Sequence, residues 1–391
     1  MKLRFAACIG LMFCMLFALS GSLHSAPLIS ITEGMDLRVN SSASTIYESN
    51  LFYAESDVES DTKLVLSPGL ELNLGRRETE IFGRLRLQGH LNYYADNSNL
   101  DNELADVRFD SHYDSRVFRA EVDLHWYQTD QNTQDIRPDF TLEEVLVERE
   151  VTNLFAQTEY RLSEKSSLGA GGRINHVNYR THRRDALSGG RGFVDRTTYE
   201  APLDLYYTYS QKLDFSTGYR YRETDVGIGS NFRDHFINIG ARGELLPRVD
   251  GQVRIGMQER RIAGGPRTGS MGVDTELNWR AGGKTLVGMN ATRDFTTSGT
   301  GVGVRRTGGG AEVTYVLTPL VLGNAGVTFT NSSYQGSTRV DDTWNLQLGM
   351  IYRPKEYVRL SAGYVYMDND SSEPGLSFSN NIVNVTASLR Y

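Results

Sequence analysis

Residues 81–93 read Ile-Phe-Gly-Arg-Leu-Arg-Leu-Gln-Gly-His-Leu-Asn-Tyr, and from Gly83 onward their polarity alternates with a period of two. Successive side chains of a β-strand point to opposite faces, so this strand has one apolar and one polar face. It is also longer than the soluble strand of about five or six residues. A strand with one face in hydrocarbon and the other in water shows this pattern, which indicates a transmembrane barrel.

The same alternation recurs along the chain. Apolar faces run from Phe118 to Trp126, Leu203 to Tyr209, Leu213 to Tyr221, Val249 to Met257, Trp344 to Tyr352 and Val358 to Tyr366. Aromatic residues gather at their ends, as an interfacial girdle requires. Short turns alternate with longer loops rich in Asp, Asn, Ser and Gly, the asymmetry expected between periplasmic and extracellular ends. The sequence predicts an all-β protein, a single antiparallel transmembrane barrel of about 18 strands without a plug domain.

The N-terminal residues have the three-part layout of a secretory signal. Lys2 and Arg4 precede an apolar run over 5–19, and small residues follow up to Ala26. This run is shorter than the roughly 20 residues of a spanning helix, which favours cleavage over anchoring. We expect residues 1–26 to be a cleaved signal peptide, with the cleavage point uncertain by a few residues, and residues 27–391 to form the barrel in the cell outer membrane.

Composition and motifs argue against several kinds of protein. Both cysteines, Cys8 and Cys14, lie in the predicted signal, so no disulfide or zinc-thiolate site is expected. A net charge of −7 without a basic block argues against nucleic-acid binding. The sequence contains no G-x-S-x-G, H-E-x-x-H or C-x-x-C motif, and we predict no enzyme, no cofactor and no metal. We interpret Gly282 to Thr285 as a tight turn, and the glycines at 189–190 and 308–310 as flexible loops.

The last segment alternates from Val383 to Tyr391 and ends the chain on an aromatic residue in the lipid-facing register. This resembles the C-terminal signal that the barrel-assembly machinery recognises, in which phenylalanine is commoner than tyrosine. The resemblance implies that Tyr391 is a membrane-assembly signal and that outer-membrane lipid and the assembly machinery are partners.

The polar faces carry arginines and carboxylates in similar numbers. The candidate lumen-facing or substrate-facing residues are Arg84, Arg86, Arg119, Arg220, Arg222 and Arg254. A strongly ion-selective pore would show one sign in excess, so a mixed lumen without a large net field is predicted. Pairing that braces the wall and contact with substrate are both open interpretations. Arg220 and Arg222 are the least balanced pair in sequence and the first choice for a ligand-facing patch.

The long loops offer two further roles. The acidic stretches 55–61 and 96–106 have oxygen ligands that suit calcium, although a solvated surface is the favoured interpretation. A barrel of this size leaves an aqueous lumen unless something fills it. The loops 129–146 and 180–196 are the candidates to fold inward and constrict it.

Three stretches resemble a family of outer-membrane β-barrel porins associated with exopolysaccharide loci. They are Tyr47-Glu48-Ser49-Asn50-Leu51-Phe52, Leu66-Ser67-Pro68-Gly69-Leu70 and Tyr93-Tyr94-Ala95-Asp96-Asn97, within the first hundred residues. The resemblance implies a pore for secreted polysaccharide that works with periplasmic export and synthesis proteins. A general diffusion porin for small solutes and a structural or adhesive barrel with a closed lumen are the alternatives.

Overall fold

The computed structural model describes residues 29–32, 34–76, 79–132, 146–180 and 192–391. The predicted signal peptide lies outside this range. The strands are β1 (Ile29–Thr32), β2 (Met35–Glu48), β3 (Asp61–Leu74), β4 (Ile81–Tyr94), β5 (Asn102–Asp114), β6 (Phe118–Thr129), β7 (Arg149–Arg161), β8 (Ser166–Tyr179), β9 (Arg196–Ser210), β10 (Leu213–Val226), β11 (Phe232–Leu246), β12 (Val249–Ile262), β13 (Arg267–Trp279), β14 (Thr285–Thr297), β15 (Gly303–Thr318), β16 (Val321–Tyr334), β17 (Val340–Lys355), β18 (Val358–Ser371) and β19 (Phe378–Arg390). A single turn of 3₁₀ helix, η1 (Ser98–Leu100), lies between β4 and β5.

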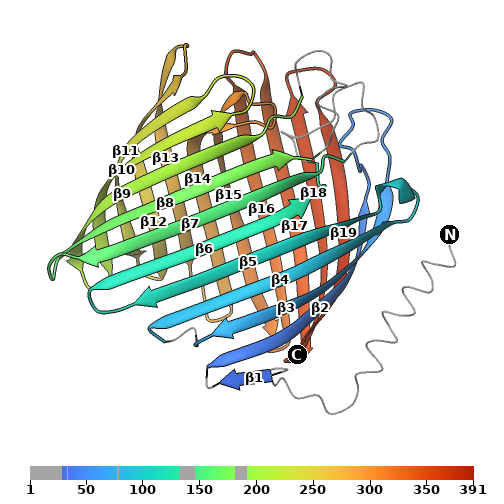
Figure 1. Cartoon of the computed structure of the whole chain (residues 1–391), viewed down its shortest axis with the longest axis horizontal. Coiled ribbons are helices and arrows are strands. Elements are labelled where there is room, and N and C mark those ends of the chain that lie inside the picture. The colour runs from blue at the N-terminus through green and yellow to red at the C-terminus, as the bar shows by residue number, and fades with distance from the viewer. Residues whose placement is uncertain (1–28, 33, 77–78, 133–145, 181–191) are drawn as a thin grey trace.

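The strands β2 to β19 pair with their neighbours in chain order, all antiparallel, and form one closed barrel. Figure 1 shows the blue strand β2 beside the red strand β19, with all strands steeply tilted. Closure extends to the last residue, because the backbones of Tyr391 and Val39 exchange two hydrogen bonds of 2.7 and 2.8 Å. The prediction of 18 strands is confirmed for the barrel wall. The short strand β1, which sequence reasoning did not predict, pairs with the start of β2.

The exposure of β11 shows which face meets lipid. Ile237 and Ile239 are 64% and 71% exposed, whereas the alternate residues Phe236 and Asn238 are each only 4% exposed. Large apolar side chains that alternate with buried polar ones place the first pair in the membrane and the second in the lumen. Exposed large apolar residues alternate along other strands in the same way, so the predicted lipid-facing residues lie on the outer face of the wall.

The connections follow the predicted asymmetry. Two-residue turns join β9 to β10, β11 to β12, β15 to β16 and β17 to β18 at one end, and the longer loops cluster at the other end (Figure 1). Among the described residues, no helix is long and apolar enough to span a membrane. The turn predicted at Gly282 is confirmed.

The prediction of a flexible loop at residues 308–310 is wrong. Gly308, Gly309 and Gly310 lie inside β15 and pair with both neighbouring strands. Their small size is required by close packing, since a Cβ on Gly310 would lie 2.6 Å from Thr328 Cγ2 and 2.8 Å from Val327 O. Glycine in a strand often marks such a close approach.

The wall has one discontinuity, between β13 and β14. Their pairing ends at Val273↔Arg293, although β13 begins at Arg267 and β14 continues to Thr297. On the other side of each strand, β12–β13 and β14–β15 pair along their full lengths. In its extracellular half, the wall therefore splits between these two strands.

Candidate functional site in the barrel lumen

Beyond the split, the end of β14 and the start of β15 form a hairpin that lies against the lumenal side of distant strands. We call residues 294–304 the inward hairpin. The backbone N–H of Val194 donates a hydrogen bond of 2.9 Å to Gly299 O, and the Arg196 side chain donates one of 2.9 Å from Nη1 to Ser298 O. Phe295 and Val304 are 1% and 0% exposed. The hairpin thus fills the lumen beside β9 to β12 near the extracellular end.

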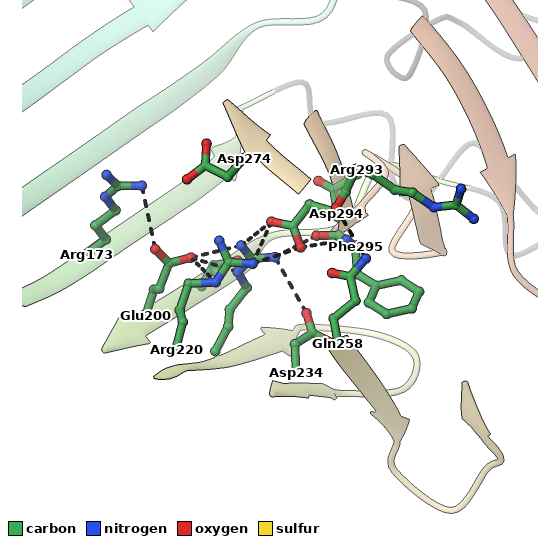
Figure 2. Close-up of polar contacts among 12 residues, drawn as sticks. Arg173, Glu200, Arg220, Asp234, Gln258, Asp274, Arg293, Asp294 and Phe295 are labelled. Atoms are coloured by element: carbon green, nitrogen blue, oxygen red, sulfur yellow. Dashed lines mark hydrogen bonds and ion pairs between the residues drawn. The ribbon is translucent and has the colours of Figure 1, made fainter. Parts of the chain in front are cut away.

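Arg222 on β10 holds this hairpin by a network of ion pairs. It donates hydrogen bonds to Glu200 Oε2 at 2.9 Å, Asp294 Oδ2 at 2.6 Å and Phe295 O at 2.6 Å. Arg220 donates two more to the carboxylate of Asp294 at 2.8 and 2.9 Å. Figure 2 shows Arg220 between Glu200 and Asp294, with Arg173 reaching Glu200 from the other side. One hairpin carboxylate therefore sits between two guanidinium groups.

Arg260 on β12 makes a second anchor and is completely buried. Its guanidinium donates to both oxygens of Asp234 at 2.7 Å and to Thr296 O at 2.6 Å. It also lies 4.7 Å from the ring centroid of Phe232 and 5.0 Å from that of Phe295. Arginine suits this place because its planar fork satisfies a carboxylate bidentately while its face stacks on aromatic rings.

Gln258 bridges the split in the wall. Its side-chain nitrogen donates to Met271 O on β13 at 3.2 Å and to Arg293 O on β14 at 3.3 Å. Arg293 also donates to Ser270 Oγ at 3.3 Å. These side chains supply hydrogen bonds where the backbone ladder has stopped, which limits the cost of the unpaired edge.

A second polar cluster lies on the same wall toward the turn end. Arg242 donates to the two oxygens of Glu159 at 2.7 and 2.8 Å and stacks 3.5 Å from the ring centroid of Tyr206. Arg254 donates to Asp204 at 3.1 Å and to Tyr206 Oη at 3.2 Å. The two clusters make a ladder of paired charges along the lumen.

Each of the six predicted arginines has a carboxylate within 4 Å. Arg84 bonds Asp110, Arg86 lies 3.9 Å from Glu71, Arg119 bonds Asp114, and Arg254 bonds Asp204, in addition to the contacts of Arg220 and Arg222. Arg220 and Arg222 are drawn into one network, whereas Arg84, Arg86 and Arg119 lie on other strands. The interpretation of Arg220 and Arg222 as the least balanced pair is wrong, because Glu200, Asp234 and Asp294 compensate them.

Sequence reasoning missed four residues that carry the arrangement: Glu200, Arg260, Gln258 and Asp294. Glu200, Gln258 and Asp294 come from strands far apart in sequence, and Asp294 reaches Arg222 only because the wall splits at Arg293. The one feature of the sequence that could have indicated these residues is the set of arginines at alternate or neighbouring positions on β10 and β12. Their charges require carboxylates from other strands.

The first and third motifs that carry the family resemblance meet at the extracellular mouth, whereas the second, Leu66 to Leu70, lies within β3. Asn50 donates to Ala54 O and Ser379 O, while its side-chain oxygen accepts from Ala54 N. Tyr94 Oη donates to Asp130 at 3.0 Å, and Leu51 and Phe52 pack against the Tyr94 ring. The first and third motifs thus fold the first loop onto its neighbours, and the second is part of the barrel wall.

Other loop residues at this mouth are also buried. Tyr53 stacks on Phe378 with ring centroids 4.7 Å apart, and burial together with the nearby Glu48 carboxylate raises the pKa of its phenol. Asp61, in the predicted calcium stretch, accepts backbone hydrogen bonds from Thr62, Asp96 and Asn97. Its oxygens are therefore occupied by protein donors, and the described residues contain no group of three or more His, Cys, Asp or Glu that could hold a metal.

The predicted constricting loops are only partly described. Residues 133–145 and 181–191, and with them Gly189 and Gly190, lie outside the described range. Their flanks pack inward, since Val147 joins Val151, Val177 and Tyr179 in a buried cluster. The element observed inside the lumen at the split is instead the inward hairpin, whose sequence contains no apolar run that would predict this position.

Comparison with known proteins decides the family. Residues 40–391 match the model of the family described as "Putative beta-barrel porin 2". The chain belongs to this porin family. It is an outer-membrane β-barrel porin and not an enzyme. A comparison with curated proteins finds no match.

Solved structures show the same fold. The outer-membrane protein OpdK of Pseudomonas aeruginosa matches with a TM-score of 0.50 at 11% identity, over 91% of this chain and 99% of OpdK. OpdO of the same organism matches with a TM-score of 0.50 at 10% identity, over 92% and 98% of the two chains. At this identity the likeness extends to the barrel alone.

Proposed function

We propose that this porin is a passive channel for uncharged polar solutes, with secreted polysaccharide as the solute class we favour. The observation that carries the proposal is the charge pairing of the lumen. Each of the six predicted lumen arginines has a carboxylate within 4 Å, so the wall presents hydrogen-bonding groups without a strong field of either sign. Such a lining exchanges hydrogen bonds with hydroxyl groups and gives little advantage to an ion.

The remaining wall supports the same preference. The lumenal parity of β16, β17 and β19 places amide side chains opposite the charged ladder, among them Asn324, Asn345, Gln347 and Asn384. Amides donate and accept hydrogen bonds without a net charge. A sugar chain would meet such groups along the whole passage.

The lumen differs between its two ends. Arg119, near the periplasmic turns, has a side chain that is 66% exposed, whereas Arg260 beside the inward hairpin is 0% exposed. The inward hairpin therefore fills the extracellular side beside β10 to β12, where Arg260 is buried, whereas the Arg119 side chain remains exposed at the periplasmic end. An export role would use periplasmic export and synthesis proteins to deliver the polymer to the periplasmic end.

Single-channel recording on the refolded protein tests this function. Neutral polysaccharide fragments added on the periplasmic side should block a stable conductance in a length-dependent manner, and fragments carrying carboxylates should block less well. Block by small neutral sugars alone, with rapid permeation of many small solutes, would favour a general diffusion porin. Absence of conductance from a correctly folded barrel would overturn the proposal in favour of a structural role.

A further inference from the structure

The split between β13 and β14 leaves two matching edges unused. On β13 the residues Arg267–Gly272 have no partner on β14, and on β14 the residues Asp294–Thr297 have none on β13. We propose that the inward hairpin is a gate with two seats: the lumenal seat seen here, and a second seat in the wall, where β14 pairs with the free edge of β13.

The existing register defines the second seat. Continuing Val273↔Arg293 by one residue at a time brings Gly272 opposite Asp294, Ser270 opposite Thr296 and Thr268 opposite Ser298. No insertion or bulge is needed, and each side chain keeps its lumenal or outward parity. The end of β14 is paired with the start of β15, and β15 is paired with β16 from Val304 onward. The inward hairpin therefore moves together with the strand ends to which it is paired, as one segment of sheet that bends at Arg293.

The lumenal seat replaces ladder hydrogen bonds by side-chain donors. Phe295 O, on the edge of β14 that faces away from β15, accepts from Arg222. Arg260 and Arg196 add hydrogen bonds to Thr296 O and Ser298 O, which point toward β15. On the other edge, Met271 O accepts from Gln258 and from Ser270. Strand edges are stable only when paired or covered. Here the hairpin is held by side-chain donors and by one backbone hydrogen bond, from Val194 N to Gly299 O, and none of these bonds belongs to a strand ladder.

The second seat would exchange the side-chain contacts of the lumenal seat for the backbone hydrogen bonds of a strand ladder. Zipping onto β13 would form backbone hydrogen bonds and would release Asp294 from Arg220 and Arg222, which retain Glu200 and Asp234. The arginines are therefore not left uncompensated when the hairpin leaves. Movement into the wall would also empty the lumen beside β10 to β12, so the second seat is the wider channel. This holds for whichever solute the channel carries.

Disulfide trapping tests the second seat. Cys8 and Cys14 lie in the predicted signal peptide, so a cysteine pair introduced at Thr268→Cys and Ser298→Cys would be the only one in the barrel. In the lumenal seat Ser298 bonds Arg196 on β9, four strands from β13, which is too far for a disulfide. Opposite residues of an antiparallel pair lie about 4.5 to 5.5 Å apart, within disulfide range. Ser270→Cys with Thr296→Cys is the second pair.

The proposal expects both pairs to cross-link in the folded protein, faster when Asp294→Asn is added, and the oxidised form to conduct several-fold more than the reduced form. Thr275→Cys with Ala291→Cys, which are already opposite one another, is the matched control and should cross-link without changing conductance. The gate is refuted if the control pair cross-links while both test pairs stay reduced, or if the test pairs cross-link at unchanged conductance. Trapping does not require conduction, so a barrel that never conducts would refute the proposed function and still test the two seats.

Discussion

Arg222 on β10 donates a 2.6 Å hydrogen bond to Asp294 on β14, although three strands separate β10 from β14 in the wall. The contact exists because β14 leaves β13 at Arg293 and crosses to the lumenal side. This ion pair therefore marks the place at which the inward hairpin fills the lumen.

Arg222→Lys should loosen the inward hairpin while keeping the positive charge. A lysine ammonium cannot reach Glu200, Asp294 and Phe295 O together, as the guanidinium fork does. Hydrogen bonds to charged groups contribute about 1.5–3 kcal/mol each, so we expect lower stability and noisier single-channel current. A variant as stable and as quiet as the wild type would show that Arg222 does not hold the hairpin.

Arg260→Met should destabilise the barrel strongly because it removes both hydrogen bonds of 2.7 Å to the buried carboxylate of Asp234 and leaves it with Arg222 at 3.7 Å. Breaking a buried pair in this way costs about 3–5 kcal/mol. Arg119→Met is the matched control, since the Arg119–Asp114 pair is exposed and such pairs contribute only about 0–1 kcal/mol. Urea unfolding in detergent, followed by the heat-modified gel shift, measures both. Equal losses in the two variants would contradict the burial argument.

Asn50→Ala should release the first extracellular loop without disturbing the wall. The side chain makes two hydrogen bonds to the backbone of Ala54, which close the loop, and one to Ser379 O on β19, each worth about 1 kcal/mol. We expect faster cleavage of this loop by protease added to intact cells, at an unchanged yield of folded barrel. Protection equal to the wild type would mean that the packing of Leu51 and Phe52 suffices.

Tyr391→Ser should lower the yield of assembled barrel, whereas Tyr391→Phe should retain it. The backbone of Tyr391 closes the barrel against Val39 in any variant, so the difference isolates the aromatic ring as a signal for the assembly machinery. The fraction of heat-modifiable protein in the outer membrane gives the result. Normal assembly of the serine variant would show that the ring of Tyr391 is not an assembly signal.

The sequence predicts the barrel well because its cause is local. Polarity alternates at Ile237 and Ile239, and from Leu85 to Tyr93, because one face of each strand meets lipid and the other meets water. Each turn is likewise predicted from its own residues. These local patterns are sufficient to predict the number of strands and the difference between short turns at one end and long loops at the other.

The site is predicted only in part because its cause is not local. The arginines on β10 are visible in the sequence, but their partners Glu200 and Asp294 come from other strands. Alternation cannot show that pairing between β13 and β14 stops at Val273, since both strands keep their pattern beyond it. The error about Arg220 and Arg222 follows directly from this, because a carboxylate 72 residues away compensates Arg222.

The reversal potential of the refolded channel under a salt gradient is the most direct measure of charge compensation in the lumen. A lumen whose arginines are paired with carboxylates predicts a cation-to-anion permeability ratio close to unity, with Asp294→Lys shifting it toward anions. Strong selectivity of the wild-type channel for either ion would contradict the central claim that the charges of the lumen compensate one another.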